Sequence, residues 1–135
     1  MALSGRHSAA EDWPRFLGPR SNGTSSETNL IDSFGPKGPP MLWQKDIGTG
    51  YSAPSIHDGK LVLHDRVANE EIVHAWSLSD GKELWRDGYP TSFIDPYGYN
   101  NGPRCTPLLT SNRCYTFGAE GKLLCLDLQS GKLVW

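Results

Sequence analysis

Two stretches of this chain repeat each other, and the spacing between them limits the folds that the chain can adopt. Residues 77–85 read SLSDGKELW and residues 127–135 read DLQSGKLVW, an offset of 50. An earlier pair, residues 53–56 and 106–109, is offset by 53. A regular period of this length indicates stacked units, each too small to bury its apolar faces alone. We therefore expect repeated structural units of about 50 residues.

Short apolar runs alternate with turn residues from position 41 onward, and no 11-residue window has helical periodicity. The predicted strand segments are 41–43, 53–56, 60–64, 72–78 and 83–85. Asp58-Gly59 between two such runs predicts a tight hairpin. The difference between the two offsets predicts a loop insertion at 67–71. With about four strands per period, the fold class is all-β: a partial β-propeller of about two four-stranded blades.

The first 40 residues differ from the rest. Two glycines and three prolines in residues 35–40 rule out a regular element there. Trp13, Phe16 and Leu17 offer apolar side chains that could pack on a surface. We predict an ordered, irregular N-terminal arm over residues 1–40 and propeller blades over residues 41–135.

Composition excludes several functions. A net charge of −2, from 13 basic and 15 acidic residues, provides no basic field for nucleic acid. No apolar run is long enough to span a membrane, and residues 1–11 lack the apolar core of a signal peptide. The three cysteines cannot form a complete disulfide framework, and the absence of C-x-x-C argues against a zinc site.

The spacing Ala75-x5-Gly81-x3-Trp85 resembles the tryptophan-docking motif of the quinoprotein, or PQQ-like, β-propeller repeats. A second copy reads Cys125-x5-Gly131-x3-Trp135, with cysteine in place of alanine. Residues 12–19, DWPRFLGP, resemble the start of secreted planctomycete-type PQQ-like repeat proteins. The resemblance covers roughly residues 12–135 and is specific for the fold rather than for the function.

The resemblance implies several properties of the whole protein. Propellers of this family usually have seven or eight blades, so this chain is interpreted as an N-terminal fragment whose partners include the remaining blades of its own chain. A strand around Trp43 would then lie on the outside of the last blade. The resemblance also implies a periplasmic or secreted location, although the chain as given carries no signal peptide.

The stretch from Tyr89 to Arg104 is the first candidate for function, because long propeller loops often carry binding residues. It offers aromatic faces, amides and a cation, and its candidate ligand-binding residues, with one from the preceding repeat, are Tyr51, Tyr97, Tyr99, Asn100 and Arg104. Because Arg104 stands just before a predicted inner strand, it could face the central funnel and meet an anion. The alternative is that these residues only pack the loop onto the propeller.

Histidines and cysteines give weaker signals. The spacing of His57, His64 and His74 does not require them to converge on a metal, and surface or hydrogen-bonded histidines are the preferred interpretation. Cys114 would face Cys125 if residues 119–120 formed the turn, or Asp127 if residues 120–121 did; buried free thiols are preferred. No carboxylate pair is placed for acid–base work, so no catalytic residue and no metal ligand is assigned.

Three functions are left open. The preferred one is a propeller that acts as a binding or protein-interaction scaffold, similar to BamB-like proteins, with catalysis not evident. The second is a PQQ-dependent quinoprotein dehydrogenase, for which PQQ and calcium are implied by resemblance alone. In that family the quinone often lies between a tryptophan and adjacent cysteines, and this sequence has no Cys-Cys pair. The third is a secreted carbohydrate- or polymer-binding propeller that uses the aromatic loop.

Overall fold

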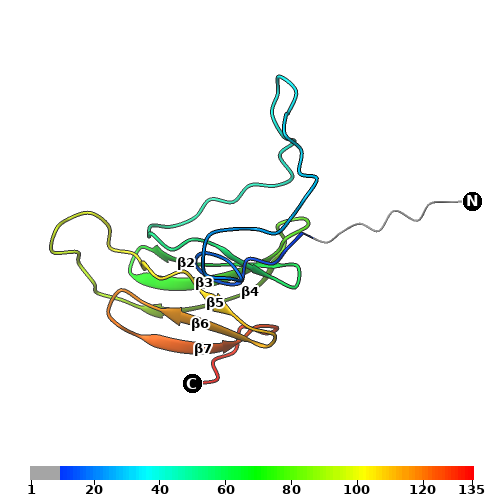
Figure 1. Ribbon diagram of the computed structural model, residues 1–135. Helices are drawn as coiled ribbons and strands as arrows, with labels where there is room; N and C mark the ends of the chain where they lie inside the picture. Colours follow the sequence, from blue (N-terminus) through cyan, green and yellow to red (C-terminus); the bar gives the residue numbers. More distant parts are fainter. Residues whose placement is uncertain (1–9) are drawn as a thin grey trace, which may run out of the picture.

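The computed structural model describes residues 10–135, which form two antiparallel sheets that pack face to face (Figure 1). The first sheet has the order β1-β2-β3-β4, with strands Ser55–His57, Lys60–Val67, Glu70–Ser77 and Glu83–Pro90. The second has the order β5-β6-β7, with strands Leu108–Leu109, Arg113–Phe117 and Leu123–Asp127. An isolated bridge from Leu126 to Leu133 continues the second sheet beyond β7. The described residues contain no helix. The prediction of an all-β, partial propeller is confirmed.

The first hairpin forms as its residues predict. Asp58 and Gly59 both have left-handed backbone conformations, with φ of 48° and 69°, and join β1 to β2. The loop insertion expected at residues 67–71 is wrong. β2 and β3 have eight residues each and β6 and β7 have five, so the additional residues lengthen the hairpin rather than its turn. Only Ala68 and Asn69 separate β2 from β3.

The register of β6 and β7 differs from both alternatives drawn from the sequence. Cys114 pairs with Leu126, and Tyr115 pairs with Cys125. The two cysteines therefore point to opposite faces of the sheet, and both are buried free thiols as preferred. Burial raises the pKa of the Cys114 thiol to about 12.

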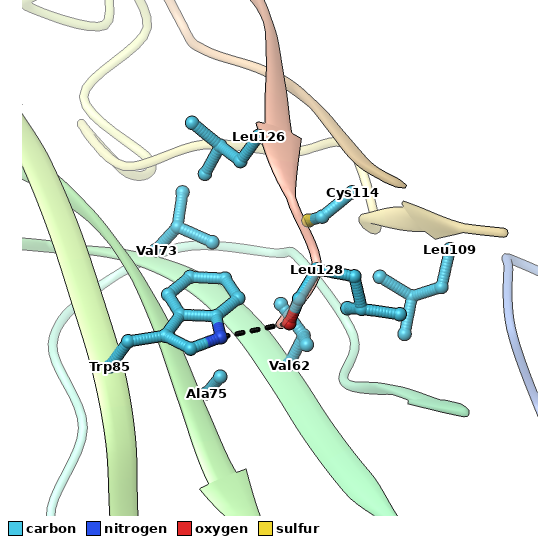
Figure 2. Close-up of a cluster of buried hydrophobic side chains, with 8 residues drawn as sticks. All are labelled: Val62, Val73, Ala75, Trp85, Leu109, Cys114, Leu126 and Leu128. Carbon is cyan, nitrogen blue, oxygen red and sulfur yellow. Dashed lines mark hydrogen bonds between the residues drawn. The ribbon is translucent and has the colours of Figure 1, made fainter. Parts of the chain in front are cut away.

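The core lies between the two sheets and contains eight buried side chains (Figure 2). The members are Val62, Val73, Ala75 and Trp85 from the first sheet, Leu109, Cys114 and Leu126 from the second, and Leu128 from the turn after β7. All are less than a tenth exposed. Burial of apolar area in this shared layer holds the two sheets together.

Trp85 connects the first sheet to a turn of the second. Its indole N–H donates to the carbonyl oxygen of Leu128 at 2.9 Å (Figure 2). Its ring lies so close to Gly131 that a Cβ there would be 2.6 Å from Cδ2. Gly131 has φ of 72°, so the position favours glycine by its backbone as well as by its contact.

Trp43 makes the same pair of contacts one repeat earlier. Its indole donates to the Leu78 carbonyl oxygen at 2.9 Å, and its ring covers Gly81, which has φ of 69°. Residues 41–43, predicted as a strand, are irregular here, and no strand of the described residues pairs with them. Their proposed place on the outside of the last blade stays a prediction. The side-chain contact repeats although the backbone pairing does not.

Residues 10–54 contain no named strand. In the N-terminal part of this segment Trp13 is half-buried, but Phe16 and Leu17 are exposed, so only one of the three apolar side chains packs as expected. Residues 1–9, most of the segment interpreted as lacking a signal peptide, lie outside the described residues.

Candidate binding surface

The loop between β4 and β5 is organised around the carboxylate of Asp95. This carboxylate accepts backbone N–H groups from Tyr97 at 3.2 Å, Tyr99 at 3.0 Å and Asn100 at 3.1 Å. The hydrogen bonds from Asn100 and Tyr97 hold the pKa of Asp95 below its usual range. The Asp95 residue itself is 5% exposed. One buried side chain therefore sets the course of the loop backbone.

Arg66 on β2 ties this loop to the first sheet. The guanidinium donates to the carbonyl oxygen of Phe93 at 2.6 Å, of Asn101 at 3.0 Å and of Ala68 at 2.8 Å. The Asn101 side chain in turn accepts the Asp95 N–H at 2.8 Å. Sequence reasoning missed Arg66, because a single arginine in a strand gives no signal of what it holds.

Two tyrosines project from the loop into solvent. Tyr97 is 80% exposed and Tyr99 is 78% exposed. Their rings are 6.3 Å apart between centroids, with planes 27° from parallel. Since the N–H groups of both residues are bound to Asp95, the loop presents these rings on a fixed backbone. A rigid display of large aromatic surface is typical of binding sites.

The structure places Arg104 against its own loop. Its guanidinium lies 3.1 Å from the Asp95 carboxylate, donates to the Asn100 carbonyl oxygen and stacks over the Phe93 ring at 5.3 Å. The Arg104 side chain is 41% exposed. The two charges of this pair offset each other, so the loop offers aromatic faces and amides rather than a net charge.

A hollow of about 340 Å³ lies beside this loop, and it brings only some of the predicted residues together. Its lining is Thr49, Ile94, Asp95, Gly98, Tyr99, Asn100 and Asn101. Tyr51 does not line it but lies on the adjoining segment, where its N–H donates to the Pro103 carbonyl oxygen at 2.9 Å. Tyr51 is 59% exposed.

A second hollow, of about 470 Å³, lies where this loop meets the second sheet. It is lined by Arg66, Asn69, Pro90, Thr91, Ser92, Ile94 and Glu120. Glu120, from the β6–β7 turn, accepts hydrogen bonds from Thr91 at 2.8 Å and Ser92 at 3.1 Å, which lower its pKa. Residues that belong to or adjoin strands of both sheets therefore line this hollow.

A cluster of buried polar side chains lies between the two sheets, next to the β6–β7 turn. The Tyr89 hydroxyl donates to Glu71 at 2.5 Å, and the Ala119 N–H donates to the other Glu71 oxygen at 2.9 Å. His64 is fully buried 3.6 Å from Glu71. Burial lowers the pKa of His64 to about 4, whereas burial and Glu71 raise the pKa of Tyr89 above its usual range.

The histidines do not converge. His57 contacts Asp12 at 2.7 Å, and His74 contacts Asp65 at 3.2 Å on the face of β3 opposite His64. Within residues 10–135, no group of three or more His, Cys, Asp or Glu side chains is arranged to hold a metal ion. In the same range, no helix is long and apolar enough to cross a membrane.

Comparisons with known proteins show three similarities. Residues 69–135 match the family model described as "Outer membrane protein assembly factor BamB". Tetrathionate hydrolase of Acidithiobacillus ferrooxidans is 27% identical over 78 residues, covering 54% of this chain and 16% of that protein. A europium-containing methanol dehydrogenase structure matches with 20% identity and a TM-score of 0.46, covering 62% of this chain and 14% of that one. The chain thus spans about a sixth of the curated relative that it matches.

Proposed function

Because residues 69–135 belong to the PQQ-like β-propeller repeat family, we propose that this chain forms propeller blades of a binding and protein-interaction scaffold. The observation that carries the proposal is the fixed loop with its two exposed tyrosines, Tyr97 and Tyr99. Tyrosine supplies large contact area at low cost in side-chain entropy, and a loop held in place before binding loses little further freedom. The proposed contact residues are Tyr51, Tyr97, Tyr99, Asn100 and Arg104.

Within this scaffold we assign the tryptophans a docking role. Trp43 and Trp85 make the same two contacts with successive glycine turns. Trp135, at the next position of the series, is 58% exposed beside Tyr115. Leu123 and Phe117 on the same outer face are 53% and 45% exposed. These observations support the proposal that Trp135 and this face pack against a further blade of the same protein.

The remaining proposals concern organisation and location. Residues 1–40 are proposed as the arm and residues 41–135 as the blades. A periplasmic or secreted location is proposed from the family, whose matching model describes an outer membrane protein assembly factor.

A saccharide is the second candidate partner. The mutual neutralisation of Asp95 and Arg104 leaves aromatic faces and the Asn100 amide as the features that this loop offers, which suits a neutral polyhydroxy ligand. For the dehydrogenase alternative, the described residues provide neither adjacent cysteines nor a cluster of carboxylates for calcium, so no step of that reaction is assigned to them.

The test places a photo-cross-linking phenylalanine analogue at position 97 in the producing cell. The matched control carries it at position 42, because Leu42 is 79% exposed and its neighbour Trp43 contacts Leu78 and Gly81, at the end of β3 opposite the loop. We expect one discrete protein adduct from position 97 and none from position 42. A Tyr99→Ala substitution, with an unchanged melting temperature, should remove that adduct.

Equal adducts at both positions, or none at position 97, would contradict the protein scaffold. Affinity electrophoresis through a neutral glucan tests the saccharide. Retardation that is lost in Tyr97→Ala would favour it over a protein partner.

A further inference from the structure

The first strands of the two sheets, β1 and β5, lie side by side and each has an edge that no neighbouring strand of its own sheet covers. The Ser55 hydroxyl joins them by donating to the Pro107 carbonyl oxygen at 2.6 Å. Unpaired N–H and C=O groups on such edges are ready to bind another extended segment. We call the neighbouring edges of β1 and β5 the edge site.

The chain's own N-terminal arm occupies the edge site in this structure. Trp13 and Ile56 exchange two backbone hydrogen bonds, of 3.0 and 2.9 Å, as an antiparallel pair. The Leu109 N–H on β5 then donates to the Pro14 carbonyl oxygen at 2.7 Å. Residues 13 and 14 thus bind both sheets, and the dark-blue arm lies along them in Figure 1. Proline fits such an outer position because it has no N–H to leave unpaired.

Side chains add selectivity to these backbone contacts. The Asp12 carboxylate lies 2.7 Å from His57 Nδ1 and accepts the Asp58 N–H at 3.1 Å. The Trp13 ring covers Gly18, where φ is 75° and a Cβ would lie 2.7 Å from the ring. The edge site therefore selects for an acidic residue, while the arm's own turn braces the aromatic residue that follows.

The arm is attached by its first part alone. Residues 28–42, which lead from this first part of the arm to the remainder of the chain, are all exposed. Arg20 closes the arm on itself through Glu11 at 2.9 Å rather than on the sheets. Release of residues 12–14 would therefore break few contacts elsewhere.

We propose that the edge site is a peptide-binding site of the strand-addition type, which residues 12–14 fill in cis. Its partner is an extended segment that has an acidic residue two positions before a proline, and it binds when the arm is displaced. This surface is separate from the tyrosine loop. A flexible tether holds a ligand at an effective concentration of about 1 mM. If the arm and an external peptide each bind the site with a Kd of about 10 µM, competition from the attached arm lowers the apparent affinity for the peptide by about 100-fold.

The test uses a fluorescein-labelled peptide with the sequence of residues 10–23, titrated by anisotropy against three forms of the full chain. These are the wild type, Trp13→Ala, which loosens the arm, and Phe16→Ala, a matched control whose side chain is 67% exposed. We expect Trp13→Ala to bind the peptide about 10- to 100-fold more tightly than the other two. A peptide with alanine in place of Asp12 should bind about 10-fold more weakly, because it lacks the contacts with His57 and the Asp58 N–H.

Equal binding to all three forms, or no binding to a Trp13→Ala chain with an unchanged melting temperature, would overturn the proposal. Should Trp13→Ala fail to fold, hydrogen exchange of the wild-type chain gives the answer. The Ile56 and Leu109 amides should then exchange together through a local opening that is nearly independent of denaturant. Exchange of both only by global unfolding would show that the arm cannot be displaced, and would equally overturn the proposal.

Discussion

Replacement of Trp85 by alanine should be among the most damaging single changes in this chain. The side chain is 8% exposed, lies in the core between the sheets and donates to Leu128. Truncation of a buried tryptophan costs about 3–5 kcal/mol, which includes the cavity left behind. The Leu128 carbonyl oxygen would also lose its donor, which adds about 1 kcal/mol. The two losses together amount to about 4–6 kcal/mol. At about 4 °C per kcal/mol for a chain of this size, the melting temperature should fall by roughly 16–24 °C.

Two matched variants separate the causes. Trp85→Phe keeps most of the apolar area but removes the N–H, and should cost about 1–2 kcal/mol. Trp135→Ala removes the same side chain from a position that is 58% exposed, and should cost less than about 1 kcal/mol in this chain. Urea denaturation followed by circular dichroism measures all three free energies of unfolding. If Trp85→Ala costs no more than Trp135→Ala, the indole is not what joins the two sheets.

Two further predictions concern the turn that meets Trp85 and the buried histidine. Gly131→Ala should destabilise the chain more than Gly121→Ala: both positions have positive φ, but only Gly131 lies against the indole, so equal melting temperatures would exclude the ring contact as a cause. His64 has a pKa of about 4 in the folded chain, below the ordinary 6.5 of the unfolded chain. As the pH is lowered from 6.5 towards 4, the unfolded chain therefore binds the proton first, and the free energy of unfolding decreases. Between pH 7 and pH 5 the loss should be about 2 kcal/mol, and His64→Gln should flatten that part of the urea-midpoint profile; an unchanged slope would refute the assignment.

The repeat spacing predicted the fold because it depends on contacts that recur. The spacing of Gly131 and Trp135 repeats that of Gly81 and Trp85. Each copy therefore identifies a glycine turn and a tryptophan from its own few residues, whatever the remainder of the chain contains. The Asp58-Gly59 hairpin is equally local, because its backbone conformation follows from the two residues themselves. Strand lengths were harder to predict, since β2 and β3 extend only as far as each finds a partner.

The candidate site depends on contacts that no local pattern encodes. Asp95 and Arg66 are 29 positions apart, yet together they set the course of one loop. Glu71 accepts a hydrogen bond from the Ala119 N–H across the interface between the sheets. Its neighbours in the sequence predict only that it lies in a strand, not which residue it contacts. The exposed tyrosines were nevertheless predicted to lie on this loop, because glycine and proline in residues 98–103 exclude a regular element. Their role as contact residues is still a prediction.

Strand pairing places the Asp12 contact of the edge site and the start of the tyrosine loop at opposite ends of the first sheet. His57, at the end of β1, pairs with Lys60, which pairs with Ser77 at the end of β3; Asp12 of the arm binds at this end. Glu70, at the start of β3, pairs with Pro90, and the tyrosine loop begins there. The intervening strands are eight residues long, so the two ends are separated by more than 20 Å. A substitution at Tyr97 should therefore leave binding at the edge site unaffected, and a loss of binding at both surfaces from that substitution would indicate unfolding rather than recognition.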